Sequence, residues 1–475
     1  MQFTGADPVP FRHVLSAIGL DVAAVGGSIH VAGDDPVIAS PHRLALASAS
    51  LLAAQGAATA ALWRHRGGGE QRIDVDCGDA ILALNPLVAL RRAGHAGFHY
   101  DDRTAPLNNF FRAGDGRWLF LTGVSPRLRD GTLRLLKCWN DVPAIADAVA
   151  KWNSFELEEA LAAARLTGSV VRTPAEWRDH PHGRHLAGKP LVEIEKIGDA
   201  PRRTFETAPR PMSGLRTIDM THVLAGPTTA RAMAEQGADV LRLTSMRPDL
   251  ADAEGVMIEM GMGKRSAVID LNLAEDRDTL AQLCAGADVF AQSWRPGLLA
   301  RHGFAPEQVA ARRPGIIYVS ITCFGLDGPW GGRGGYDVIA LNATGFTAEE
   351  SAVDAPRFAP CGIVTDHMAG FLGGAAVAST LLRQAREGGS YHIKISLAQI
   401  AMWVQSLGLV TVDGVPMPPV PRMERIESPY GPLEYLASPI RYTETPAWFE
   451  RPPAPEGSSP PVWLQGERDA ISGGG

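Results

Sequence analysis

The chain has 475 residues, of which 45% are hydrophobic and 20% charged, and its formal net charge is −7. At a prior of about 150 residues per domain, this length accommodates two or three domains with a substantial core. The negative charge disfavours a nucleic-acid binder, because phosphate-backbone affinity comes from clustered Lys and Arg. No run approaches the ~18 to 20 consecutive apolar residues of a membrane helix, so a globular protein is expected.

The N-terminus and the cysteines bear on the compartment. The opening MQFTGADPVPFRHVL has no basic stretch followed by an apolar block, so neither a secretory signal nor a transit peptide is expected, and we predict a cytoplasmic protein. Five cysteines stand far apart without a C-x-x-C pair. This spacing argues against a disulfide framework or a zinc site, and without a His, Cys and carboxylate cluster at ligand spacing no metal is expected.

The first segment, 1–105, contains an Ala-rich helical pattern followed by a Gly-rich turn and the alternating run QRIDVD. The same succession of helix, turn and strand over 48–76 returns at 368–396, an offset of about 320 residues. We interpret this match as an internal repeat.

A different composition follows at 106–200. The run NNFFRAGDGRWLFLTG predicts a β-hairpin with its turn at Gly114, Asp115 and Gly116, and mixed helical segments come after it. This favours a small α+β domain. Residues 201–213 are rich in Pro and Arg and lack periodicity, which is typical of a linker.

From Arg216 onwards, short β-rich runs such as RTIDMT, ADVLRLT and GIIYVSIT alternate with helical segments. This alternation predicts an α/β domain over 214–460, with a Rossmann-like open, mostly parallel sheet and covering helices. The loop VLAGP after the first strand lacks G-x-G-x-x-G, so a nicotinamide or flavin dinucleotide is not expected. The remaining residues, 461–475, are expected to form a disordered tail.

Five segments of this half, in order, carry a family resemblance: TIDMTHVLAGPTTARAMAEQGADVLRL, GKRSAVIDL, ADVFAQSWRPGLLARHGF, PGIIYVSITCFGLDGPWGGRGGYD and GIVTDHMAGFLGGAAVASTLLR. The chain resembles the family III CoA-transferases, also called the CaiB/BaiF family, which includes formyl-CoA and carnitine CoA-transferases and the α-methylacyl-CoA racemases. The N-terminal half resembles the later portion of that family. The resemblance therefore implies rearranged and partly duplicated modules, in which the N-terminal half supplies the small domain that the second module lacks.

The resemblance implies that Asp366 is the nucleophile of a CoA-transferase. A carboxylate can hold an acyl group as an anhydride and then CoA as a thioester. The predicted helix start at Asp366 would favour its ionised form. Without the resemblance, an N-cap or first-turn aspartate is the favoured interpretation, because Asp is common at helix N-caps. The repeat places Leu46 at the matching position of the first helix, and because leucine cannot be acylated only one half is expected to be catalytic.

CoA carries a diphosphate and a 3′-phosphate, which favour helix N-termini together with Lys or Arg. By resemblance, the CoA-binding positions are His222, Val223, Leu224, Ala225, Lys264, Trp294, Arg301 and Tyr336. Of these, Lys264 and Arg301 are the strongest phosphate candidates. The expected partners are an acyl-CoA and a carboxylic acid, with no permanently bound cofactor. Since family members form interlocked dimers, a homodimer is also expected.

Two other hypotheses stay open. The racemases pair their aspartate with a histidine in a G-H-D context, whereas this chain has Gly335-Tyr336-Asp337, and a tyrosine with a pKa near ~10 is a poor acid or base at neutral pH. Transfer is therefore favoured over racemisation unless His367 points inward. The missing aspartate of one module and the excised small domain of the other also allow a non-catalytic CoA-binding paralogue, and Ser293 in place of a common Asn implies different substrate handling.

Overall fold

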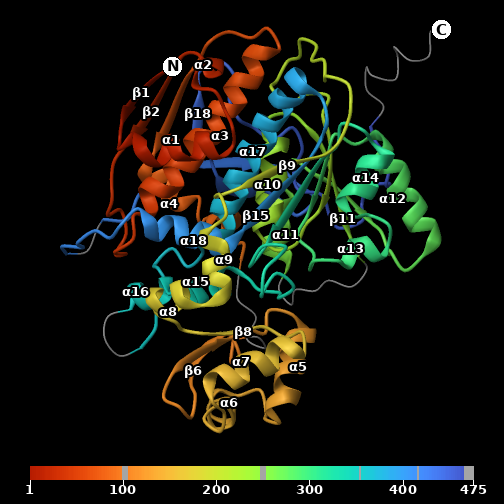
Figure 1. Cartoon of the computed structure of the whole chain (residues 1–475). Coiled ribbons are helices and arrows are strands. Elements are labelled where there is room, and N and C mark those ends of the chain that lie inside the picture. Colours follow the sequence, from red (N-terminus) through yellow and green to blue (C-terminus); the bar gives the residue numbers. More distant parts are fainter. Residues whose placement is uncertain (99–104, 246–252, 352–354, 415–416, 465–475) are drawn as a thin grey trace.

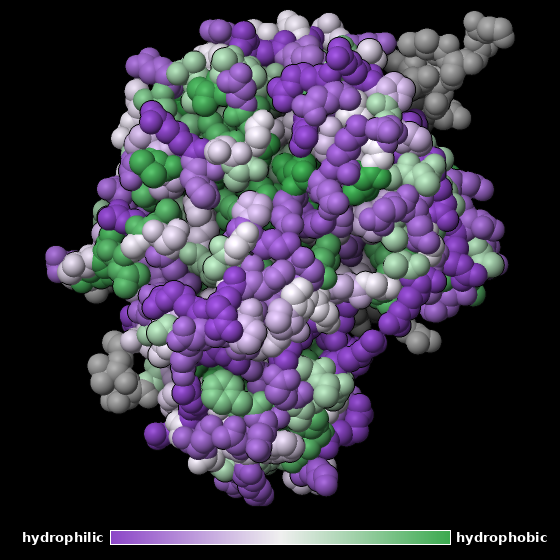
Figure 2. Space-filling model, viewed as in Figure 1, coloured by the Kyte–Doolittle hydropathy of each residue, from purple (hydrophilic) through white to green (hydrophobic). Residues whose placement is uncertain are grey.

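The protein is described by a computed structural model for residues 1–98, 105–245, 253–351, 355–414 and 417–464. Figure 1 shows a large body of sheets and helices, with a smaller unit at one end. The face seen in Figure 2 is mostly hydrophilic, and its apolar residues lie in small groups between charged ones. Such scattered apolar groups are ordinary on a folded protein surface.

The largest sheet has seven strands in the order β12-β11-β10-β13-β14-β15-β9. The six parallel strands are β10 (Arg216–Met220), β11 (Asp239–Thr244), β12 (Arg265–Val268), β13 (Val289–Gln292), β14 (Ile317–Thr322) and β15 (Ser390–Ser396). β9 (Glu193–Gly198) closes one edge in the antiparallel direction. Counted from β10, the parallel order is 3-2-1-4-5-6, the order of a dinucleotide-binding Rossmann sheet. The predicted fold class is therefore confirmed.

Helices cover both faces of this sheet, which explains why several of its strands are largely apolar. Val289 and Ala291 of β13 join the core that contains α10 and α17, whereas Phe290 between them joins the core beneath α12 and α14. Side chains of a strand alternate between faces, so two separate cores require two apolar sets. The helices of this half are α10 (Ala225–Ala234), α11 (Ala253–Gly261), α12 (Ala274–Gly286), α13 (Leu298–Arg301), α14 (Pro306–Arg312), α15 (Asp337–Thr344), α16 (Phe346–Glu350), α17 (Thr365–Glu387) and α18 (Leu397–Ser406).

The N-terminal segment builds a four-stranded sheet in the order β1-β2-β3-β18. Its strands are β1 (Gln2–Gly5), β2 (Ser28–Ala32), β3 (Arg72–Asp76) and, antiparallel to β3, β18 (Ile440–Tyr442). The helices are α1 (Pro8–Ala17), α2 (Val22–Val25), α3 (Leu44–His65), α4 (Cys77–Leu82) and the short 3-10 helix η1 (Pro86–Val88). The succession α3, β3, α4 has the same order as α17, β15, α18.

Helix α3 packs directly against α17, so the repeated helices meet at the centre of the molecule. It is long and apolar enough to cross a membrane by length and composition, but its most apolar 18-residue window is entirely buried within the protein. Burial on all sides requires a helix that is apolar all round, which accounts for its Ala-rich and Leu-rich sequence.

The two halves exchange strands. β9 comes from the N-terminal half and completes the large sheet beside β15, while β18 comes from the C-terminal half and completes the small sheet beside β3. A further sheet, β16-β17-β4-β5, also mixes the halves, because β4 (Arg91–Arg92) and β5 (His95–Ala96) join β16 (Met423–Ile426) and β17 (Leu433–Leu436). Each half therefore supplies strands that the other half lacks.

The smaller unit contains β6 (Asn109–Arg112), β7 (Trp118–Leu121), β8 (Gly168–Val170), α5 (Pro126–Leu136), α6 (Val142–Val149) and α7 (Ser154–Ala163). The predicted hairpin is β6 with β7. This unit has its own apolar core, which spans residues 107–170 and so ends before the predicted boundary at 200. The reason is that Trp177 of α8 (Pro174–Asp179) and Leu186 of α9 (Pro181–Ala187) belong to the main core.

The linker and the described part of the tail both make contacts with the rest of the protein that their composition does not predict. Within 201–213 there is no helix or strand, but the Arg203 guanidinium binds the Asp288 carboxylate at 2.8 Å. In the predicted tail, the Trp463 indole N–H donates to the carbonyl of Leu283 at 3.0 Å. Residues 461–464 are therefore held against α12, while 465–475 lie outside the described residues.

Candidate functional site

A cavity of about 480 Å³ lies at the carboxyl ends of the parallel strands. Its lining includes His222 and Val223 after β10, Ser293 and Trp294 after β13, and Cys323 after β14. β10 and β13 are neighbours in the sheet, and the strand order reverses between them. Ligands of open α/β sheets bind at such a switch point, because the loops that follow the two strands diverge there.

The smaller unit forms the opposite wall of this cavity. Arg127 from the first turn of α5, together with Arg165 and Thr167 from the connection between α7 and β8, lines the same space as the loops of the large sheet. The cavity therefore lies between a sheet of the C-terminal half and a unit of the N-terminal half, as the rearranged modules predict.

Asp366 is the second residue of α17, and its carboxyl group lines the cavity. The residue is 6% exposed, and within the described chain its carboxyl group has no hydrogen-bond partner. Burial, and then the nearby Asp337 carboxyl, raise the pKa of Asp366 well above its ordinary value. The prediction that the helix start keeps this group ionised is therefore wrong.

The start of α17 is occupied by Asp337. Its Oδ1 accepts the backbone N–H groups of Val364 at 3.2 Å and Thr365 at 2.5 Å, as well as the Thr365 hydroxyl at 2.6 Å. Burial raises the pKa of Asp337 despite these bonds. The helix dipole therefore acts mainly on Asp337, while Asp366 faces the cavity beside it.

The loops after β10 and β13 are tied together at the mouth of the cavity. The backbone N–H of His222 donates to the Ser293 hydroxyl at 2.8 Å, and the His222 and Trp294 rings meet edge-on with centroids 4.0 Å apart. Val223 has a φ of +63°, which is strained for a β-branched residue. Ser293 thus fixes a strained turn that begins α10, a helix whose N-terminus faces the cavity.

The structure brings six of the eight predicted CoA-binding residues into the lining with Asp366: His222, Val223, Ala225, Trp294, Arg301 and Tyr336. It does not bring in Leu224, whose side chain packs with Leu87 and Met260.

The phosphate-binding role predicted for Lys264 needs correction. Its ammonium is buried and contacts the Asp219 carboxylate at 2.7 Å and the carbonyl of Pro227 at 2.8 Å. Burial lowers the pKa of Lys264 to about 8, although Asp219 opposes that shift. The charge of Lys264 is thus matched inside the protein rather than presented to the cavity.

Arginines dominate the described lining of the cavity, and only Arg301 among them is singled out by the sequence analysis. Six arginines line it, against the two carboxyl groups of Asp366 and Glu456; they are Arg127, Arg165, Arg242, Arg295, Arg301 and Arg333. Burial, and then Arg127, lower the pKa of Arg295, with Arg165 acting in the same direction. Such crowding of like charges suits an anionic ligand. Arg295 follows Trp294 in SWRPG and could have been found, whereas Arg127 and Arg165 have no local signal.

His367 does not provide a second acid or base. Its Nδ1 lies 3.0 Å from the Thr228 hydroxyl on α10, and the residue is absent from the cavity lining. Burial lowers the pKa of His367 to about 3, so the ring is neutral at physiological pH. The side chain therefore belongs to the packing between α10 and α17.

The family model of CoA-transferase family III matches this chain over residues 12–200 and 212–421. The chain belongs to CoA-transferase family III. The two matched segments of the family III chain fall on its two halves, which supports the repeat inferred from 48–76 and 368–396.

Relatives with assigned names match parts of this family III chain. It is 32% identical over 261 residues to the acetyl-coenzyme A transferase nodX of Hypoxylon pulicicidum, covering 51% of this chain and 44% of that protein. It is 30% identical over 206 residues to the succinate–glutarate CoA-transferase of Agrobacterium fabrum, covering 40% and 52%. The crystal structure of Rv3272 from M. tuberculosis is 26% identical, covers 42% and 56%, and superposes with a TM-score of 0.40. The chain spans about half the length of the curated relatives it matches.

Proposed function

We propose that the protein transfers CoA from an acyl-CoA thioester to a carboxylic acid, with Asp366 as the covalent nucleophile. One observation carries this proposal: an almost buried carboxyl group, with no hydrogen-bond partner among the described residues, lines a cavity rich in arginine. A structural aspartate in such a place would be expected to have donors around it. Asp337, which accepts three bonds at the same helix start, shows the contrast.

In the proposed reaction, the Asp366 carboxylate attacks the thioester carbonyl of the donor. The carbon–sulfur bond breaks, and CoA leaves as a thiolate while an aspartyl anhydride forms. The thiolate then attacks the aspartyl carbonyl, which releases the donor acid as a carboxylate and leaves an aspartyl-CoA thioester. The acceptor carboxylate repeats the two steps in reverse order, so that Asp366 is regenerated and no net proton is consumed.

CoA itself would lie along the carboxyl edge of the sheet. α10 begins at Ala225, which lines the cavity together with Val223 of the preceding loop, and a helix N-terminus favours phosphate. Arg301, exposed at the end of α13, and Arg242 at the end of β11 supply positive charge on the same side, and Trp294 offers an aromatic surface. In this proposal these groups replace the buried Lys264 as partners of the CoA phosphates.

The raised pKa of Asp366 has a consequence for this mechanism. The nucleophile is the ionised carboxylate, so the neutral form that burial and Asp337 favour is inactive. The transfer rate should therefore rise as pH rises through the raised pKa of Asp366. On acidification, activity should be lost at a higher pH than it would be for an aspartate with an ordinary pKa.

The proposal is tested by peptide mass spectrometry after incubation with acetyl-CoA or succinyl-CoA and hydroxylamine, which traps acyl-aspartate. We expect a hydroxamate or a CoA adduct on the peptide that contains Asp366, absent from Asp366→Asn, a variant of nearly equal size. The substitution Glu387→Gln at the exposed end of α17 serves as the control and should keep the adduct. CoA binding without an adduct from either donor would contradict the proposal, and solvent deuterium at the α-carbon of a chiral acyl-CoA would indicate a racemase.

A further inference from the structure

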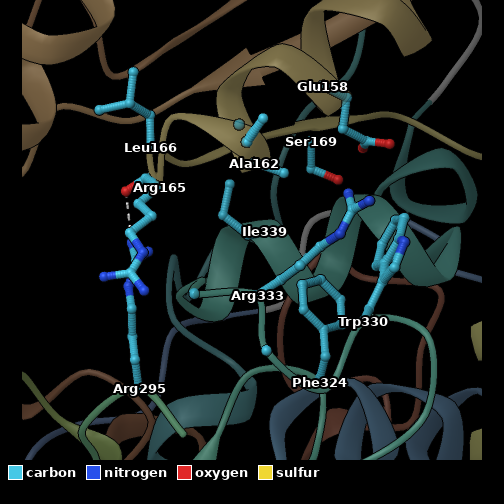
Figure 3. Close-up of a pocket in the computed structure, with 14 residues that line it drawn as sticks. Glu158, Ala162, Arg165, Leu166, Ser169, Arg295, Phe324, Trp330, Arg333 and Ile339 are labelled. Carbon is cyan, nitrogen blue, oxygen red and sulfur yellow. Dashed lines mark hydrogen bonds between the residues drawn. The ribbon is translucent and has the colours of Figure 1, made fainter. Parts of the chain in front are cut away.

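A second pocket, of about 200 Å³, adjoins the cavity that holds Asp366. Figure 3 shows its two walls: Ala162, Leu166 and Ser169 of the smaller unit on one side, with Phe324 and Ile339 of the large body on the other. The two spaces are continuous, because Arg165, Arg295, Arg333 and the glycines at 332 and 334 line both. We call this second space the acid pocket.

Positive charge in the acid pocket exceeds negative charge. The Arg295 guanidinium donates to the backbone carbonyl of Arg165 at 2.9 Å. Among the described residues, neither the Arg295 nor the Arg165 guanidinium has a carboxylate partner. The carboxylate of Glu158 is already matched by buried Arg172, which donates to it at 2.8 Å.

Arg333 is the remaining charge, and it is only loosely matched. Its guanidinium contacts both oxygens of Glu159 at 2.6 Å, but that glutamate side chain is 62% exposed. The guanidinium carbon lies 4.2 Å from the centre of the Trp330 ring, and Figure 3 shows the group pointing toward Ser169 and Glu158. The Arg333 side chain is 20% exposed and that of Glu159 62%, so the pair lies at the rim of the pocket, where water screens it and a ligand carboxylate could take the place of Glu159.

The acid pocket begins next to the surroundings of the nucleophile. Cys323 and Gly335 line the same cavity as Asp366, and Gly334 lines both spaces. A β-carbon placed on Gly335 would lie 2.5 Å from the Cys323 sulfur, and one placed on Gly334 would lie 2.7 Å from Nε of Arg295. These glycines let the chain pass between the nucleophile and the arginines without a side chain in the way.

We propose that the acid pocket receives the far carboxylate of a short dicarboxylic acyl group while its thioester lies at Asp366. This inference rests on the proposed transfer function and narrows its substrate class. Arg333 and Arg295 would bind the carboxylate, since a guanidinium matches two carboxylate oxygens at once. Phe324 and Ile339 would contact the methylene groups. A space of about 200 Å³, below the roughly 300 Å³ of a drug-sized site, limits the acyl group to a few carbons.

The test compares succinyl-CoA with butyryl-CoA as donors, because both have four-carbon acyl groups and only one ends in a carboxylate. Transfer to acetate gives kcat/KM for each donor. We expect the wild type to prefer succinyl-CoA, and Arg333→Met to lower that preference by about 10- to 100-fold, as expected for losing a hydrogen bond to a charged group. With butyryl-CoA, which has no terminal carboxylate for Arg333, the loss in Arg333→Met should be much smaller than with succinyl-CoA. Arg383→Met, in an exposed pair on α17, is the matched control.

Arg333→Lys is a second variant, in case Arg333→Met does not fold. It retains the positive charge, so its preference for succinyl-CoA over butyryl-CoA should lie between those of the wild type and Arg333→Met. Equal use of the two donors by the wild type, or an equal loss for both donors in Arg333→Met, would overturn the acid pocket while leaving the transfer function standing. The second result would assign Arg333 to CoA itself. Transfer from neither donor by the wild type would overturn the transfer function and with it this inference.

Discussion

His42 ties the two halves of the chain together through a buried polar contact. Its side chain has no exposed surface, and its Nδ1 and Nε2 lie 2.8 Å from Glu350 and 3.1 Å from Glu349 at the end of α16. The ring also stacks on Phe346, with centroids 3.6 Å apart. Burial disfavours the charged ring, but the hydrogen bonds to Glu349 and Glu350 outweigh it and raise the pKa of His42.

The substitution His42→Phe keeps an aromatic ring against Phe346 and removes both polar contacts. It leaves Glu350, whose side chain has no exposed surface, with the Ser40 hydroxyl as its remaining partner in the described chain. Removing one partner of a buried ion pair typically costs about 3–5 kcal/mol, because the other charge stays buried. We therefore expect His42→Phe to lower the free energy of unfolding by about that amount at pH 7.

Urea unfolding of wild type and His42→Phe, followed by circular dichroism from pH 6 to 9, measures this effect. Because the pKa of His42 is raised in the folded state, its stabilisation is complete below the unfolded value of about 6.5 and is lost as pH rises through the folded pKa. The difference in the free energy of unfolding between wild type and His42→Phe should therefore become smaller as pH rises. Adding Glu350→Gln to the variant should recover part of the loss. An unchanged unfolding midpoint, or a gap that ignores pH, would refute the reasoning.

Two further substitutions separate chemistry from stability. Asp337→Asn keeps an oxygen for the Thr365 N–H but removes the charge that raises the pKa of Asp366, so the acid limb of the pH profile of kcat/KM should move to lower pH; an unmoved limb would contradict this. Lys264→Met leaves Asp219 buried without its cation and should cost about 3–5 kcal/mol in urea unfolding, while KM for the acyl-CoA stays unchanged. Wild-type stability with a raised KM would restore the phosphate-binding role to Lys264.

The sequence predicts the large sheet well because its information is local. Several strands from β10 to β15 are short and largely apolar, as burial on both faces of the sheet requires. The repeat is equally visible, since α3 and α17 meet the same demand for an all-round apolar helix. The strands β1 and β2 are not predicted from the sequence. Each is short, and each pairs with a strand that is distant in the sequence.

The site is only partly predictable, for a different reason. Asp366 and Trp294 can be predicted because they stand in the ordered segments that carry the family resemblance. The segment GKRS does not show that the Lys264 side chain turns inward to Asp219 on β10. Arg127 and Arg165 reach the cavity only because the smaller unit folds back over the sheet. The raised pKa of Asp366 likewise depends on burial and then on Asp337, a residue of α15 that approaches Asp366 only in the folded protein.

The exchange of β9 and β18 makes the two halves dependent on each other for folding. A polypeptide cut within 201–213 would leave β9 without β15 and β3 without β18, and each fragment would carry an open sheet edge that invites aggregation. Neither fragment would bring the smaller unit and Asp366 together. Co-expressed fragments would have to associate before either could fold completely. The covalent link between the halves avoids this step, because it gives each half a high effective concentration of the other.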